Sequence, residues 1–186
     1  VGNMVRRSSR ATGDYTEYGY DHLNQLSSAD IFDSNGQLQA AVRYQYDVYG
    51  RVTAYTSDPD GAGPQPANTH YRTYSGADLW ADLDADGNPV SRYMYLRGID
   101  QPVARYRPGE GAAFYLTDRQ GSVRAVIDDQ SALLNTIDYD SYGVPLVESN
   151  PLDDDRRKYT AREYDALLGL YDYRSRHYDP ELGRFV

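Results

Sequence analysis

Residues 37–53 read QLQAAVRYQYDVYGRVT and alternate between two kinds of side chain. One face carries Leu38, Ala40, Val42, Tyr44 and Tyr46, and the other face is mostly polar. A period of two residues is typical of a β-strand that buries one face. The segment Asp47-Val-Tyr-Gly50 predicts a turn, because Asp accepts hydrogen bonds from turn amides and Gly adopts a positive φ. A second strand is expected to begin at Val52.

The same pattern recurs along the chain. Residues 18–21 (YGYD) match residues 44–47 (YQYD), and residues 139–143 (YDSYG) form a shorter copy. The dipeptides Asn35-Gly36, Asp60-Gly61 and Asp86-Gly87 are hairpin signals. Weaker alternation in residues 90–96, 123–127 and 133–139 predicts further strands. Only residues 163–170 leave room for a short turn of helix, so the sequence predicts an all-β fold built of antiparallel hairpins.

The amino-acid composition argues against several classes of function and of structural site. The 186 residues include 20 Tyr but only 3 Phe and 1 Trp, and the formal net charge is -9. An acidic surface repels phosphates, so nucleic-acid binding is not expected. The absence of cysteine excludes disulfides and thiolate metal sites, and no apolar run is long enough to span a bilayer. The basic residues 156–158 directly follow acidic residues, and this offsetting of charge predicts a solvated loop.

The candidate sites in the sequence have structural explanations as well as functional ones. Asp82-Leu-Asp84-Ala-Asp86 begins like a calcium loop, but the twelfth position is Tyr93 instead of an acid, which favours a hairpin turn. The histidines have no zinc-site spacing, and no Gly-x-Ser-x-Gly motif is present. No catalytic residue, metal ligand or cofactor is therefore predicted. Exposed tyrosines could stack on sugar rings, although cross-strand packing explains them as well.

Longer motifs give the chain a resemblance to a known family. Residues 46–53 (YDVYGRVT), 115–124 (YLTDRQGSVR) and 162–185 (REYDALLGLYDYRSRHYDPELGRF) are similar to motifs of the RHS/YD-repeat family. This family includes bacterial RHS polymorphic toxins, the C component of insecticidal toxin complexes and the YD shell of teneurins. The chain departs from the common pattern at Leu116, Ala161 and His177. The matching motif residues are Tyr46, Asp47, Gly50, Arg51, Asp118, Gly121, Arg162, Asp165, Gly169, Leu170, Arg174, Arg176, Tyr178, Asp179, Pro180, Gly183, Arg184 and Phe185.

The resemblance implies a spiral ribbon of antiparallel β-hairpins that forms part of a shell. Residues 1–110 would be YD/RHS repeats, and residues 111–186 would be the RHS repeat-associated core region. Such a shell encloses or carries a C-terminal polypeptide, a toxin in many members, in a secreted or cell-surface bacterial protein. The expected partners are the adjoining repeats and the enclosed polypeptide. The autoprotease motif of the family would follow residue 186, so no enzymatic activity is expected within these residues.

Two further expectations can be tested against the structure. Residues 162–185 are expected to fold inward as a plug, with arginines such as Arg176 and Arg184 pairing with carboxylates. The alternative function is a cell-surface adhesin or glycan-binding module that uses exposed tyrosines, with cell-surface glycans as partners. The two functions differ in the expected context: a shell fragment predicts many more YD repeats upstream and a variable domain after Val186, whereas a binding module predicts closed ends.

Overall fold

The computed structural model describes residues 2–98, 100–153 and 155–186. These residues contain short strands and one 3-10 turn, but no α-helix. The strands are β1 (Arg6–Ser8), β2 (Tyr15–Tyr20), β3 (Leu26–Phe32), β4 (Leu38–Tyr46), β5 (Val52–Asp58), β6 (Asn68–Ser75), β7 (Asp78–Leu83), β8 (Pro89–Tyr95), β9 (Pro102–Arg107), β10 (Gly111–Thr117), β11 (Val123–Asp128), β12 (Leu133–Tyr139), β13 (Pro145–Glu148), β14 (Glu163–Asp165), β15 (Leu170–Asp172), β16 (His177–Asp179) and β17 (Arg184–Phe185). The 3-10 turn covers Tyr159–Ala161. No helix in the described ranges is long and apolar enough to cross a membrane.

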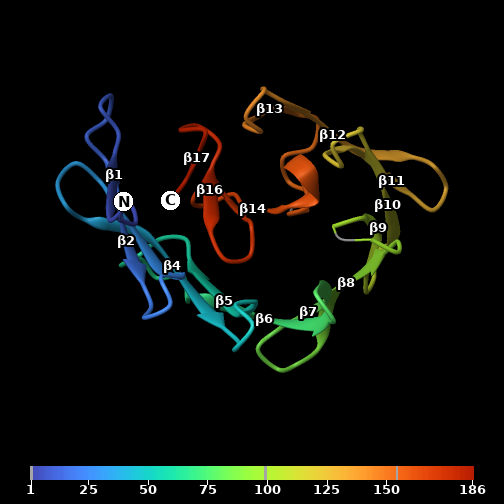
Figure 1. Cartoon of the computed structure of the whole chain (residues 1–186), viewed down its shortest axis with the longest axis horizontal. Helices are drawn as coiled ribbons and strands as arrows, with labels where there is room; N and C mark the ends of the chain where they lie inside the picture. The colour runs from blue at the N-terminus through green and yellow to red at the C-terminus, as the bar shows by residue number, and fades with distance from the viewer. Residues whose placement is uncertain (1, 99, 154) are drawn as a thin grey trace.

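The strands form two antiparallel sheets. Strands β1–β13 pair in sequence order as a 13-stranded sheet, and β14–β17 form a 4-stranded sheet. Figure 1 shows that the larger sheet curves into an open arc, and that the smaller sheet lies inside the curve. We call β1–β13 the arc and β14–β17 the inner sheet. This architecture confirms the predicted all-β ribbon of antiparallel hairpins.

One turn geometry joins most neighbouring strands. In the turn after β4, Asp47 Oδ1 accepts hydrogen bonds from the amides of Tyr49 and Arg51, at 2.9 and 3.0 Å. Gly50 takes the positive φ of 75° that closes the turn. The sequence singled out three such aspartates, and the described ranges contain seven that accept from the amides two and four residues ahead: Asp21, Asp33, Asp47, Asp84, Asp118, Asp128 and Asp140. The same short motif therefore fixes the pairing register of the two neighbouring strands at each of these turns.

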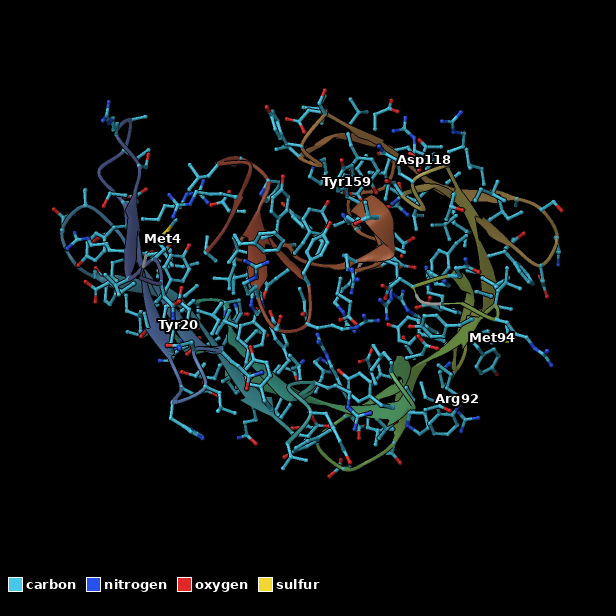
Figure 2. The ribbon with its side chains drawn as sticks, viewed as in Figure 1. Met4, Tyr20, Arg92, Met94, Asp118 and Tyr159 are labelled. Carbon is cyan, nitrogen blue, oxygen red and sulfur yellow. The ribbon has the colours of Figure 1, made fainter. Side chains whose placement is uncertain are left out.

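The tyrosines at the strand ends bind the ribbon together on its inner face. Tyr44 and Tyr46 lie on a common face, as predicted, and Tyr44 is buried. Several tyrosine hydroxyls donate to a backbone carbonyl of another part of the ribbon at 2.7–2.8 Å: Tyr20 to Met4, Tyr46 to Leu26, Tyr74 to Val52, and Tyr139 to Val123. Figure 2 shows Tyr20 close to Met4. A buried ring with a satisfied hydroxyl explains the preference for Tyr over Phe.

The main hydrophobic core lies between the arc and the inner sheet. Its buried members come from β2–β5 and from residues 168–170 of the inner sheet: Tyr18, Leu26, Ala29, Val42, Tyr44, Val52, Leu168 and Leu170. The helical turn that the sequence allowed at residues 163–170 is absent, because this segment forms β14, a turn at Gly169 and β15. The strand order continues from β9 to β10 across residues 110 and 111, so the division into domains of residues 1–110 and 111–186 stays a prediction.

Changing Gly50 to Val is expected to lower the free energy of unfolding by about 1–3 kcal/mol, because a non-glycine residue is strained at positive φ. Urea unfolding measures this change. The control is Val48→Thr, which keeps a β-branched residue at a turn position that is 90% exposed. An unchanged midpoint for Gly50→Val would contradict the role assigned to this turn.

Candidate functional site

The inner sheet is attached to both ends of the arc. At the β1 end, Arg7 Nη1 lies 3.0 Å from Oδ2 of Asp179, which is fully buried. At the other end, the Tyr171 hydroxyl donates to Gly143 O at 2.8 Å, and the Tyr178 hydroxyl donates to Tyr142 O at 3.0 Å. The inner sheet therefore lies across the inside of the arc and contacts both of its ends.

Glu163 of β14 is the centre of the contact with the middle of the arc. Its carboxylate lies 3.0 Å from Arg72 Nη2, 3.3 Å from Arg156 Nε and 3.2 Å from Arg157 Nη2. Burial by itself would raise the pKa of Glu163, but the charges of Arg72, Arg156 and Arg157 overcome this effect and hold the pKa at about 2. Glu163 is therefore ionised at every pH at which the protein would ordinarily work.

Further ion pairs extend from this centre. Asp82 Oδ2 accepts hydrogen bonds at 2.8 Å from Arg156 Nη2 and from the Tyr93 hydroxyl. Arg105 binds Asp153 at 2.8 Å and Asp155 at 2.6 Å. We call Arg72, Asp82, Arg105, Asp153, Asp155, Arg156, Arg157 and Glu163 the buried ion network. It connects β6, β7 and β9 of the arc to the 153–158 segment and to the inner sheet.

The prediction of a solvated loop at residues 156–158 is wrong. Arg157 and Lys158 are each 7% exposed, and Asp155 is 3% exposed. Lys158 Nζ pairs with Glu148 Oε2 at 2.7 Å. The similar numbers of acidic and basic residues around positions 156–158 do not reveal whether these side chains form ion pairs with residues on distant strands. The side chain of Asp155 pairs with Arg105 of β9, Lys158 with Glu148 of β13, and Arg157 with Glu163 of β14.

Sequence reasoning also missed the arc's half of the network. Arg72, Asp82 and Arg105 lie in strands, where charged side chains usually face water. For Arg72 the sequence does carry a signal, because Arg72 is two residues from Tyr74. The pairing of Arg105 with Tyr93 across the sheet is visible only in the structure. Side chains two apart on a strand share a face. A charged residue on the tyrosine face of a strand is therefore expected to have a buried partner.

The motif residues named from the sequence fall into three groups. Six lie in or beside arc turns: Tyr46, Asp47, Gly50, Arg51, Asp118 and Gly121. Eight are buried or half-buried in or next to the inner sheet: Arg162, Asp165, Gly169, Leu170, Arg174, Tyr178, Asp179 and Pro180. Four are exposed: Arg176, Gly183, Arg184 and Phe185. In the second group, Arg162, Asp165, Arg174, Tyr178 and Asp179 bind residues of the arc.

Three members of the second group, Asp165, Arg162 and Arg174, bind side chains of the arc. Asp165 Oδ2 accepts from the Tyr44 hydroxyl of β4 at 2.6 Å. Asp100 of the arc binds Arg162 at 2.5 Å through one oxygen and Arg174 at 2.9 Å through the other. The expectation that Arg176 and Arg184 would pair inward is not met: Arg176 lies over the Phe185 ring at 4.0 Å, and Arg184 is exposed.

Arg162→Ala is expected to destabilise the chain more than Arg184→Ala. Arg162 is 17% exposed and its loss leaves Asp100 with a single partner, whereas Arg184 lies at the surface. We expect a loss of about 1–3 kcal/mol for Arg162→Ala and about 0.5 kcal/mol or less for Arg184→Ala. Thermal or urea unfolding compares the two variants, and equal losses would count against the assigned contacts.

A cavity of about 390 Å³ lies between the arc and the inner sheet. Its lining mixes the tyrosines Tyr44, Tyr55 and Tyr164 with ion-paired groups such as Arg72 and Glu163. Within residues 2–98, 100–153 and 155–186, no group of three or more His, Asp or Glu has an arrangement that could hold a metal ion. Asp82, the first residue of the calcium-like run, is bound instead to Arg156 and Tyr93. The arrangement is suited to holding two sheets together.

The chain is similar in sequence to a known family and to several known proteins. The model of the teneurin YD-shell family matches residues 102–186. The tRNA3(Ser)-specific nuclease WapA of Bacillus spizizenii is 30% identical over 191 residues, which cover 97% of this chain and 7% of that protein. Salivary gland surface protein 1 of Aedes aegypti is 42% identical over 72 residues, which cover 38% of this chain and 2% of that protein.

Solved structures show the same arrangement of strands. The crystal structure of TcdB2-TccC3-TEV matches with a TM-score of 0.68 and 16% identity, over 91% of this chain and 9% of that one. The Tc holotoxin pore of Photorhabdus luminescens matches with a TM-score of 0.69 and 16% identity, over 91% of this chain and 8% of that one. At this identity the likeness concerns the fold, and the chain spans less than a tenth of the length of these proteins.

Proposed function

The chain belongs to the RHS/YD-repeat family, and we propose that it is the part of an RHS shell that holds the shell's inward-turned end in place around a C-terminal polypeptide. The observation that carries this proposal is the docking of the inner sheet inside the arc through the buried ion network (Figure 1). The amide of Val186 donates to His177 O at 2.9 Å, so a polypeptide that continues from Val186 would start on the concave side.

The proposed role is structural instead of catalytic. The contacts described above pair buried charges with one another across the two sheets. The nuclease activity in the name of the Bacillus relatives belongs to proteins of which this chain spans 7%. We assign the chain to the shell and propose that the parent protein acts outside the cell or at its surface.

A glycan-binding module is the second candidate, and the contacts favour it less. The repeat tyrosines, such as Tyr20, Tyr46 and Tyr74, use their hydroxyls to bind backbone carbonyls on the inner face. The most exposed tyrosines, Tyr49 and Tyr142, lie in separate turns. A sugar platform needs neighbouring rings on one open surface, and these two turns do not supply one.

Protease protection tests the shell proposal. In the full-length protein that contains this chain, we expect the polypeptide after residue 186 to resist added protease that cleaves the same polypeptide produced alone. The control is digestion after the shell has been unfolded in urea. Cleavage at the same rate in the intact protein and in isolation would contradict enclosure, while the fold of the shell itself would be unaffected by that outcome.

A further inference from the structure

His177 is a buried histidine at the junction of the two sheets. It lies on β16, is 2% exposed, and packs against the Tyr44 ring of β4 with ring centroids 5.0 Å apart. Its Nε2 atom is buried and has no hydrogen-bond partner in the described part of the chain. A protonated ring would therefore be a buried charge with no direct acceptor at Nε2.

The charged neighbours of His177 are already bound to other groups. Asp165 of β14 accepts from the Tyr44 hydroxyl and from the amides of Leu167 and Leu168. Asp172 of β15 accepts from the amide of Arg174 and lies 3.7 Å from Arg72 Nη1. Further ionisable groups come from the strands that pack around His177 or line the same cavity: Tyr44 of β4, Tyr55 of β5, His70 and Arg72 of β6, Tyr164 of β14 and Asp179 of β16.

These neighbours do not form a ready site for an imidazolium ion. Asp165 and Asp172 would attract the proton, while Arg72 would repel it. Asp179, two residues along the same strand, is engaged by Arg7 at 3.0 Å. A protonated ring would have to draw one of these carboxylates from its present partner. Each such exchange would break a contact between the inner sheet and the arc.

We propose that His177 makes the attachment of the inner sheet to the arc sensitive to acid, so that protonation of its ring loosens the sheet from the inside of the shell. The proposal uses the docked sheet of the proposed function, but it does not depend on what the shell encloses. In a parent shell, a fall in pH would then weaken the inward-turned end before the arc itself unfolds. The trigger would be a single buried side chain.

Burial lowers the pKa of His177 below its ordinary value of 6.5. The unfolded chain therefore binds a proton more readily than the folded chain does. By linkage, the stability that neutral His177 contributes is fully present above pH 6.5 and is lost as the pH falls below it. The effect of Glu163 belongs to a separate window, since its stabilising charge is lost only between its ordinary value of 4.5 and about 2.

Urea unfolding of the intact chain between pH 8 and pH 5.5 tests this proposal. In the wild type, the unfolding equilibrium constant should rise as the pH falls below 6.5, by up to about tenfold per pH unit for one proton. His177→Phe keeps a ring in the core but cannot titrate, so its curve should be flatter in this range. His22→Gln, which changes an exposed histidine, should behave like the wild type. A slope in His177→Phe equal to that of the wild type would overturn the proposal.

Nuclear magnetic resonance of the wild type gives an independent readout if His177→Phe does not fold. The His177 ring should stay neutral at pH values below 6.5, the ordinary pKa of a histidine. Amide hydrogen exchange at pH 5.5 should show residues 163–179 losing protection before residues 38–46. A His177 ring that is already half protonated at pH 6.5 or above would refute the acid switch. If residues 163–179 were unprotected even at pH 7.5, the docked sheet itself would be refuted, so the two failures are distinguishable.

Discussion

Replacing Glu163 with Gln is expected to lower the free energy of unfolding by about 3–5 kcal/mol, the largest effect of any single charged residue here. The amide leaves Arg72, Arg156 and Arg157 facing one another without the carboxylate that binds all three. Breaking one side of a buried ion pair costs more than the pair contributes, because the remaining charges stay desolvated. Chemical unfolding at neutral pH measures the loss.

The matched control is Glu17→Gln. Glu17 pairs with Arg6 at 3.7 Å, and both side chains are about half exposed. A pair of this kind contributes about 0–1 kcal/mol. Similar losses in Glu163→Gln and Glu17→Gln would show that the network is not buried in solution. The wild type should also lose stability as the pH falls from 4.5 towards 2, and Glu163→Gln should lack that part of the acid dependence.

Leu170→Ala is the second large effect, with an expected loss of about 2–5 kcal/mol. Leu170 is fully buried on β15 and belongs to the core cluster that β2–β5 line. Truncation removes apolar contacts and leaves a cavity between the two sheets. Leu182→Ala serves as the control, because Leu182 is in the same C-terminal segment and is 48% exposed. If both leucines gave the same small loss, the inner sheet would not be packed on the arc.

Local features of the fold could be predicted from the sequence. The turn at Asp47 involves residues no more than four apart, so the residue types themselves carry the information. The alternation in residues 37–47 gives the buried face of β4 for the same reason. The antiparallel pairing in sequence order then follows from the short hairpin turns, since a tight turn leaves the next strand no other neighbour.

Long-range contacts could not be predicted in the same way. Arg72 and Glu163 lie far apart in the sequence, and the residues next to each of them do not indicate that the two form an ion pair. Arg176 and Arg184 were expected to pair inward because the composition of residues 162–185 is mixed. In the structure Arg176 lies in the turn before β16, Arg184 lies on the edge strand β17, and both residues are exposed. The motif resemblance identified the inward-turned segment, and only the structure shows which of its residues hold it.

Amide hydrogen exchange is the most direct test of the claim that the inner sheet is fixed inside the arc. Strands β14–β17 have at most three residues each, so few backbone hydrogen bonds protect their amides unless the sheet packs on another element. If the sheet is docked, the amides of residues 163–172 should exchange nearly as slowly at neutral pH as those of residues 40–44 in β4. Rapid exchange in residues 163–172, with residues 40–44 still protected, would contradict the claim.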